Sequence, residues 1–332
     1  MPTHDDYIGF VPDVLGMYGL WPYGDPEPVV GGSLNFNFLT HSDGGEHFLR
    51  RYRDNLELPR IMGEHALVKW IAERGIPAPV PESIPDKGTV AVMGGGHWAL
   101  YPWVEGIVRE RGSLTAEQAH LLGSAHGAIQ AILAGHPADP NERPQLIWDK
   151  AQSLELLQRL RKIAAERNAE PWMQEHLANQ AEHLQSLEVL PPSAFASLPR
   201  QVLHGDFHDH QVMWDGDQIV AVVDWEIWRT DPRMWEVIRS LSFSQMLESP
   251  RMEDYLAGYR QFVQLGEDEI RLGFKLWWQS RVVGTWAWAE YFLAGNERVA
   301  KFLPNIAREF KNLQDAAWRA GIEARFISAA SG

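Results

Sequence analysis

Apolar positions recur along the chain at two spacings, and each spacing predicts a kind of element. Apolar and polar residues alternate over residues 34–38, a turn follows at 42–45, and residues 47–52 supply a partner strand. A second hairpin is predicted over 90–102, and the helical spacing of residues 60–74 predicts a helix between the hairpins. The first hundred residues are therefore expected to form a small antiparallel sheet with a helix.

Beyond residue 103 the spacing is mostly helical. Thr115 and Gln118 form the capping box of a helix on whose apolar face His126 is expected to be a hydrogen-bonded core residue. One long helix is predicted over residues 268–293, with tryptophans at helical spacing. Tryptophans at that spacing usually fill a core, but an aromatic wall also suits a cationic ligand.

Residues 201–226 carry the candidate chemistry. A short strand leads to Asp206, and a third hairpin turns at residues 215–217 and ends at Asp224. Such a hairpin brings Asp224 back beside the loop that holds Asp206 and Gln211. Phosphorylation of a hydroxyl needs one acid to orient and deprotonate the nucleophile, and two oxygen ligands for Mg²⁺.

Composition narrows the class of partner. A net charge of −14 argues against a nucleic-acid or anionic-membrane partner and fits a small, cationic or zwitterionic substrate. The chain has no cysteine, which removes disulfide and thiol chemistry and agrees with a cytoplasmic location. The N-terminal stretch MPTHDDYIGF has no apolar core, so no signal peptide is expected, and no apolar run is long enough to span a membrane.

The ordered set formed by His204-Gly205-Asp206, Gln211 and Asp224-Trp225-Glu226 resembles the aminoglycoside phosphotransferase and choline kinase-like family, which includes type II homoserine kinases. The resemblance covers about residues 30–240. It implies an α+β, bilobal protein-kinase-like fold, with an N-terminal nucleotide-binding lobe over 1–102 and a larger, mainly helical catalytic lobe over 103–332. The hinge falls at about residues 100–106.

The resemblance also implies ATP- and Mg²⁺-dependent transfer of a phosphoryl group to a hydroxyl of a small molecule, such as an amino alcohol, a choline-like or an aminoglycoside-like acceptor. Asp206 takes the place of the catalytic base, and Gln211 and Asp224 those of the metal ligands. The family most often has Asn where this chain has Gln211; the longer side chain carries the same amide oxygen.

By the same resemblance, a glycine-led hairpin covers the nucleotide phosphates, and the backbone of the hinge receives the adenine. Arg50 replaces the lysine that usually contacts the phosphates, and Glu64 on the following helix pairs with it. The residues expected to contact the nucleotide are Gly31, Gly32, Ser33, Arg50, Glu64, Tyr101 and Trp103.

The segment after Asp224 is short, which favours a small-molecule acceptor over a polypeptide. The residues expected to contact the acceptor are Trp225, Glu226, Trp228 and His208. Glu236, on the helix that follows, is expected to brace the catalytic loop.

Two other functions fit the residues. A pseudokinase that acts as a binding module is suggested by the departures at Arg50 and Gln211. A metallohydrolase is suggested by the cluster of metal-ligand types His204, Asp206, His208 and His210.

Overall fold

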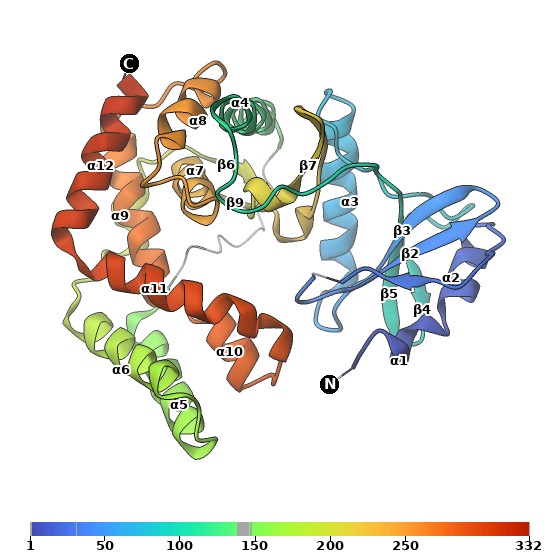
Figure 1. Cartoon of the computed structure of the whole chain (residues 1–332), viewed down its shortest axis with the longest axis horizontal. Helices are drawn as coiled ribbons and strands as arrows, with labels where there is room; N and C mark the ends of the chain where they lie inside the picture. Colours follow the sequence, from blue (N-terminus) through green and yellow to red (C-terminus); the bar gives the residue numbers. More distant parts are fainter. Residues whose placement is uncertain (1, 31, 138–145, 147, 332) are drawn as a thin grey trace. The chain divides into compact units, whose positions relative to one another are not determined.

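The computed structural model describes residues 2–30, 32–137, 146 and 148–331 (Figure 1). The chain forms two compact units, each built from two segments. The first unit comprises Met1–Arg109 and His210–Trp228, and the second comprises Glu110–Asp209 and Arg229–Gly332. The hairpin with the candidate metal ligands therefore belongs to the N-terminal unit, although it follows a hundred residues of the other unit in sequence.

A five-stranded antiparallel sheet in the order β1-β2-β3-β5-β4 forms the centre of the first unit. The alternating stretch pairs as predicted, and the turn at Ser42–Gly45 joins its two strands. The strands are β1 (Glu27–Pro28), β2 (Phe36–Ser42), β3 (Gly45–Arg51), β4 (Ala91–Met93) and β5 (Gly96–Pro102). The helices of this unit are α1 (Asp5–Ile8), α2 (Val11–Met17) and α3 (Leu58–Ala72).

The two faces of this sheet bury different side chains. Leu49 of β3 packs in one cluster with Val14 of α2 and with Trp98 and Leu100 of β5. On the opposite face, Tyr52, Ala99 and Tyr101 pack with Ile61 of α3. Because side chains alternate along a strand, Arg50 points away from the face that holds Leu49.

The third hairpin of the first unit joins β7 (Val212–Asp215) and β8 (Gln218–Val222). The predicted D-G turn at 215–217 closes it, and a short 3₁₀ helix (Trp225–Ile227) follows. Val222 N–H donates to the Pro77 carbonyl at 2.7 Å, and Trp214 exchanges backbone hydrogen bonds with Ile107. These bonds attach the hairpin to the N-terminal segment of the unit.

The second unit is mainly helical, and a two-stranded antiparallel sheet of β6 with β9 carries its candidate loop. The strands are β6 (Arg200–Leu203) and β9 (Arg229–Pro232). The helices are α4 (Ala116–Leu133), α5 (Lys150–Glu166), α6 (Pro171–Ser186), α7 (Arg233–Phe243), α8 (Arg251–Tyr259), α9 (Glu267–Val283), α10 (Trp286–Phe292), α11 (Leu303–Gln314) and α12 (Ala316–Ser331). Further 3₁₀ turns are Pro192–Phe195, Asp209–Gln211, which ends in the first unit, and Glu297–Phe302.

Helices α4 and α8 approach each other at glycines (Figure 1). The predicted capping box of Thr115 and Gln118 opens α4 and is confirmed. A Cβ at Gly123 of α4 would lie 1.9 Å from the Tyr255 carbonyl oxygen, and one at Gly258 of α8 would lie 2.0 Å from the His120 carbonyl oxygen. Only glycine permits this distance between the two backbones.

The single long helix predicted over residues 268–293 is wrong. The helix ends at Val283, and α10 starts at Trp286 after an extended Gly284. The Gln180 side chain amide of α6 donates to the carbonyls of Val282 and Gly284 at 2.8 and 2.9 Å. In an uninterrupted helix these two carbonyls would accept hydrogen bonds from the following turn. Here a side chain of a distant helix donates to them instead, so the break depends on tertiary contacts.

After the break, α10 places one of its two tryptophans in a second core. Trp288 is buried with Phe292 among residues of α5, α6 and α11, and Trp277 of α9 is buried as well. The core interpretation of these tryptophans therefore holds, whereas Trp286 is 48% exposed. Within the described ranges, no helix is both long and apolar enough to cross a bilayer.

Candidate active site

The candidate site of the first unit is centred on Arg50, which contacts two acidic side chains. Its Nη1 lies 3.7 Å from Glu64 Oε1 of α3 and 3.2 Å from Asp224 Oδ1 at the end of the β7–β8 hairpin. Arg50 and Glu64 are buried, whereas the Asp224 side chain is 40% exposed. Three residues that the sequence singled out separately, from three distant segments, thus form one charged cluster.

Burial controls the charge of this cluster. Desolvation raises the pKa of Glu64 to about 8, although the neighbouring Arg50 opposes that shift. Desolvation would by itself lower the pKa of Arg50, but Asp224, the two tyrosines Tyr101 and Tyr52, and Glu64 together hold it well above its usual value. Arg50 is therefore a permanent cation, and Asp224 is its more exposed acidic partner.

Gln211 and Asp224 lie at the open end of the β7–β8 hairpin. The Val223 N–H donates to the Gln211 carbonyl at 2.9 Å, so the hairpin holds the two candidate ligands in register. Asp224 adopts the left-handed conformation, with φ +64°, before the chain enters the 3₁₀ helix. Non-glycine residues seldom adopt this conformation, and those that do are concentrated at functional sites.

The glycine-led turn before β2 is tied to the segment after Asp224. Asn35 donates from its amide to the Glu226 carboxylate and accepts from the Arg53 N–H at 3.0 Å, while Arg53 forms an ion pair with Glu226 at 3.1 Å. Of the predicted phosphate-contacting residues, Gly32 and Ser33 precede β2, and Gly31 lies outside the described residues. Asn35 was not predicted, and the sequence offered no signal for it beyond its place in the alternating stretch.

The predicted hinge residues take part in the sheet. Tyr101 of β5 is buried, pairs with Phe48 of β3, and its hydroxyl lies 2.7 Å from that of Tyr52. The Trp103 N–H donates to the Glu46 carbonyl at 3.3 Å. A role for Tyr101 and Trp103 in holding adenine stays a prediction.

Asp206 belongs to the second unit, in the loop that follows β6. Gly205 before it has φ +90°, a conformation that favours glycine, and the Asp206 N–H donates to His204 Nδ1 at 3.2 Å. The Asp206 carboxylate forms an ion pair with Arg239 of α7, and His208 Nε2 lies 3.8 Å from Oδ1. Burial would raise the pKa of Asp206, but Arg239, His208 and His204 together lower it.

Glu236 of α7 holds this loop in place through hydrogen bonds. Its carboxylate accepts from the Gly205 N–H, from His126 Nε2 at 3.2 Å and from the Gln130 amide at 3.2 Å. Burial opposes ionisation, yet the bonds and attraction of His126 and His204 lower the pKa of Glu236 to about 2. His126 is fully buried and bonded, as expected for a core histidine.

The predicted acceptor contacts fall into two groups. Trp225 is 2% exposed and donates from its indole to the Val222 carbonyl, and Trp228 packs on α3, where the Arg60 guanidinium lies 4.5 Å from the ring. Together with the bonds of Glu226, this favours a structural role for Trp225, Glu226 and Trp228. His208, in contrast, lies beside Asp206 in the second unit.

The histidine cluster is not arranged for metal. Among the residues the structure describes, no group of three or more His, Asp or Glu side chains could hold a metal ion. His208 Nδ1 instead lies 3.3 Å from Asp209 Oδ1. The metallohydrolase hypothesis receives no support from this geometry.

Arg239, which forms an ion pair with Asp206, is a second residue of the candidate site that was not predicted from the sequence. It lies three residues after Glu236 on α7, and residues at that spacing share a helix face. Because Glu236 was expected to brace the catalytic loop, its helical neighbour on that face was a detectable candidate.

Comparisons with known proteins identify the family and the fold. The profile of the phosphotransferase enzyme family matches residues 25–272. The homoserine kinase of Bradyrhizobium diazoefficiens is 25% identical over 232 residues, which are 68% of this chain and 65% of the relative. The chain thus spans less than two thirds of the length of that curated relative.

Solved structures of similar fold have lower identity. The Plasmodium vivax ethanolamine kinase has a TM-score of 0.63 at 12% identity, covering 96% of this chain and 91% of its own. The amicoumacin kinase hAmiN, in complex with AMP-PNP, Ca²⁺ and amicoumacin, has a TM-score of 0.58 at 15% identity, covering 90% of this chain and 88% of its own. The predicted α+β, kinase-like fold and the family resemblance are confirmed. The chain belongs to the phosphotransferase enzyme family.

Proposed function

We propose that the protein transfers the γ-phosphoryl group of ATP to a hydroxyl of a small molecule, with Mg²⁺ as the metal. The observation that carries this proposal is the position of Arg50, whose Nη1 lies 3.7 Å from Glu64 and 3.2 Å from Asp224. A strand cation paired with a helix acid and next to a metal-binding acid is the arrangement that phosphoryl transfer requires around the nucleotide phosphates.

The chain fits a magnesium ion at Gln211 and Asp224. Both are oxygen donors, which this hard cation prefers, and the Asp224 carboxylate is partly exposed and already attracts the cationic Arg50. Bound there, Mg²⁺ would supply charge neutralisation for the β- and γ-phosphates. Arg50, kept cationic by its neighbours, would hold the nucleotide from the side of β3.

Asp206 orients the acceptor in this proposal. The acceptor oxygen forms a bond to the γ-phosphorus while the bond from that phosphorus to the departing ADP oxygen breaks, and the hydroxyl proton passes to Asp206. The lowered pKa of Asp206 makes it a modest base. Its main contribution is therefore the orientation of the hydroxyl, which suits a reaction in which positioning dominates.

The similar proteins support the choice of donor and acceptor. AMP-PNP occupies the amicoumacin kinase, and the relatives are named for homoserine and ethanolamine, each of which carries a hydroxyl. ATP as the phosphoryl donor also agrees with the predicted cytoplasmic location. A small amino alcohol or hydroxy amino acid is thus the acceptor class that we propose.

The test uses ADP release over amino alcohols, hydroxy amino acids and aminoglycosides, with Asp206→Ala and Asp224→Asn. Asp206→Ala should lower kcat by about a hundredfold or more and keep the thermal stabilisation by Mg-nucleotide. Asp224→Asn should lose the Mg²⁺-dependent part of that stabilisation. Asp217→Asn, in the exposed turn of the same hairpin, is the matched control.

Normal turnover by Asp206→Ala would refute the assigned base. Stabilisation of the wild-type chain by Mg-nucleotide without phosphorylation of any acceptor would instead support the pseudokinase.

A further inference from the structure

Trp235, Arg239 and Phe243 lie four residues apart along α7, so their side chains share one face of the helix. The guanidinium carbon of Arg239 lies 4.1 Å from the centre of the Phe243 ring and 5.7 Å from that of the Trp235 ring. A guanidinium is attracted to aromatic rings, and packing against them limits the rotamers of its side chain. Helix α7 of the second unit therefore holds Arg239 in place before any acceptor binds.

Arg239 holds the carboxylate of Asp206 at one of its two oxygens. Its Nη2 forms an ion pair with Asp206 Oδ1, and His208 Nε2 lies 3.8 Å from the same oxygen. Because both side chains lie at Oδ1, an acceptor hydroxyl that bonds to Oδ2 competes with neither of them. The ion pair is thus compatible with the reaction and does not have to open for it.

Two other arginines close to the same aromatic ring have acids of their own. Arg281 of α9, whose guanidinium carbon lies 5.4 Å from the Phe243 ring centre, forms an ion pair with Glu309 of α11. Arg111, at 6.0 Å from that centre, lies 4.0 Å from the carboxylate of Asp209. Within the described ranges, the arginine that pairs with the candidate base is therefore the one on α7.

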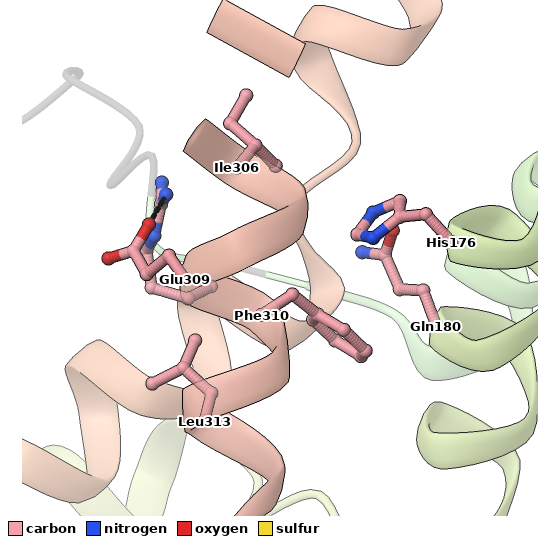
Figure 2. A pocket seen from close by; sticks show the side chains of 7 residues that line it. His176, Gln180, Ile306, Glu309, Phe310 and Leu313 are labelled. Atoms are coloured by element: carbon pink, nitrogen blue, oxygen red, sulfur yellow. Dashed lines mark hydrogen bonds and ion pairs between the residues drawn. The ribbon is translucent and has the colours of Figure 1, made fainter. Parts of the chain in front are cut away.

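Arg281 is a close structural match to Arg239. Its side chain is 16% exposed and that of its acid 20%, against 12% and 20% for Arg239 and its acid. Figure 2 shows Glu309 on α11, across a small cavity from His176 and Gln180 of α6. The cavity has a volume of about 10 Å³, which is room for a single water and too little for an acceptor. Removal of Arg281 thus removes a comparable ion pair that does not involve the candidate base.

The ion pair decides where the second oxygen of the Asp206 carboxylate points. The terminal torsion of an aspartate side chain is broad, so the carboxylate by itself has no sharply preferred orientation. A partner fixed at Oδ1 removes that freedom and fixes the direction of Oδ2 as well. In a reaction that depends on positioning, a misplacement of about 1 Å lowers the rate about a hundredfold. The orientation of Asp206 is therefore a property that the reaction needs.

We propose that Arg239 is a positioning residue of the reaction, which fixes Asp206 through Oδ1 and thereby directs Oδ2 toward the acceptor hydroxyl. The hydroxyl proton passes to Oδ2 while the ion pair at Oδ1 stays closed. Arg239 itself contacts neither the acceptor nor the nucleotide and acts only through Asp206. This proposal rests on the phosphotransferase function proposed above and deepens it, because it concerns how the base is held.

The test measures ADP release with the amino alcohol, hydroxy amino acid or aminoglycoside that the wild type phosphorylates fastest. Arg239→Gln should lower kcat by about tenfold to a hundredfold and leave KM for the acceptor and for ATP nearly unchanged. Arg239→Lys keeps the charge without the planar fork and should recover part of the loss; it also carries the comparison if Arg239→Gln does not fold. Arg281→Gln is the matched control and should keep kcat near that of the wild type.

Two further measurements separate positioning from a role in the fold. Burial raises the pKa of Asp206, but Arg239 and the two histidines of the loop lower it below its ordinary value of 3.8. Loss of Arg239 raises that pKa, so the acidic limb of the kcat profile should move to higher pH in Arg239→Gln and stay in place in Arg281→Gln. In single-turnover assays with radiolabelled ATP, Arg239→Gln should cause no further loss in an Asp206→Ala background, because the residue that it positions is gone.

Three results would overturn the proposal. They are a wild-type kcat in Arg239→Gln, equal losses in Arg239→Gln and Arg281→Gln, and losses by Arg239→Gln and Asp206→Ala that multiply in the double variant. The last result would place Arg239 on the transferring phosphoryl group or in the fold. Failure of the proposed function has a different signature, which is a wild type without turnover or normal turnover by Asp206→Ala. An inactive Asp206→Ala together with a fully active Arg239→Gln refutes the role of Arg239 alone.

Discussion

Glu236→Gln is the sharpest test of how α7 holds the catalytic loop. The Glu236 carboxylate is buried and accepts from Gly205, His126 and Gln130. Glutamine has nearly the same shape but no charge, and its amide nitrogen cannot accept these bonds. The substitution therefore removes the charged acceptor and leaves the volume of the core unchanged.

The pKa of Glu236 gives the expected size of the effect. It is about 2 in the folded chain, against an ordinary value of 4.5. Since each tenfold change in proton affinity corresponds to about 1.4 kcal/mol, ionised Glu236 stabilises the fold by about 3 kcal/mol. A lowered pKa contributes stability that is present above the ordinary value and is lost as the pH falls from 4.5 toward about 2.

Urea unfolding of the wild type and Glu236→Gln, followed between neutral pH and about pH 3, measures this contribution. The difference in the free energy of unfolding should be about 3 kcal/mol at neutral pH and less than half of that at about pH 3. Glu175→Gln, on the exposed face of α6, is the control for the loss of a carboxylate that does not contact the loop. A Glu236→Gln difference that stays constant with pH would refute the ionised, loop-bracing role.

Two further predictions concern the core of each unit. Gly123→Ala should destabilise the chain by about 1–3 kcal/mol or more, because the new Cβ would lie 1.9 Å from the Tyr255 carbonyl oxygen. Gly266→Ala, where nothing lies within 4 Å, should leave the melting temperature nearly unchanged, and equal effects of the two would contradict this account of α4 and α8. Glu64 has a pKa raised to about 8, so the stability that its carboxyl contributes is complete below its ordinary value of 4.5 and is lost as the pH rises through about 8. Glu64→Gln should therefore be nearly neutral below about pH 4.5 and increasingly more stable than the wild type as the pH rises from there to about 8, as thermal denaturation across pH can check; the opposite trend would show that the fold favours the ionised form of Glu64.

Local signals in the sequence were sufficient for most elements. The alternating stretch formed β2 and β3, and the capping box of Thr115 opened α4, because these patterns depend on neighbours within four residues. The failure at residues 268–293 had a distant cause. The bonds from Gln180 to the carbonyls of Val282 and Gly284 join positions more than a hundred residues apart.

The candidate site divides in the same way. His204-Gly205-Asp206, Gln211 and Asp224 were visible in sequence because the chemistry of a phosphotransferase requires those residue types in that order. The residues that form ion pairs with these acids could not be identified from the sequence, because any cationic side chain that the fold places nearby can pair with a carboxylate.

The sequence by itself therefore determined the family and the antiparallel and helical halves, and it singled out the candidate reactive groups. Tertiary structure alone decided that the β7–β8 hairpin joins the N-terminal unit, that Asn35 bonds to Glu226 from 191 residues away, and that Arg239 forms an ion pair with Asp206. The physical reason is one of range. Backbone propensities and turn residues act over a few positions, whereas the pairing and burial of charges are set by whichever distant segments share a core.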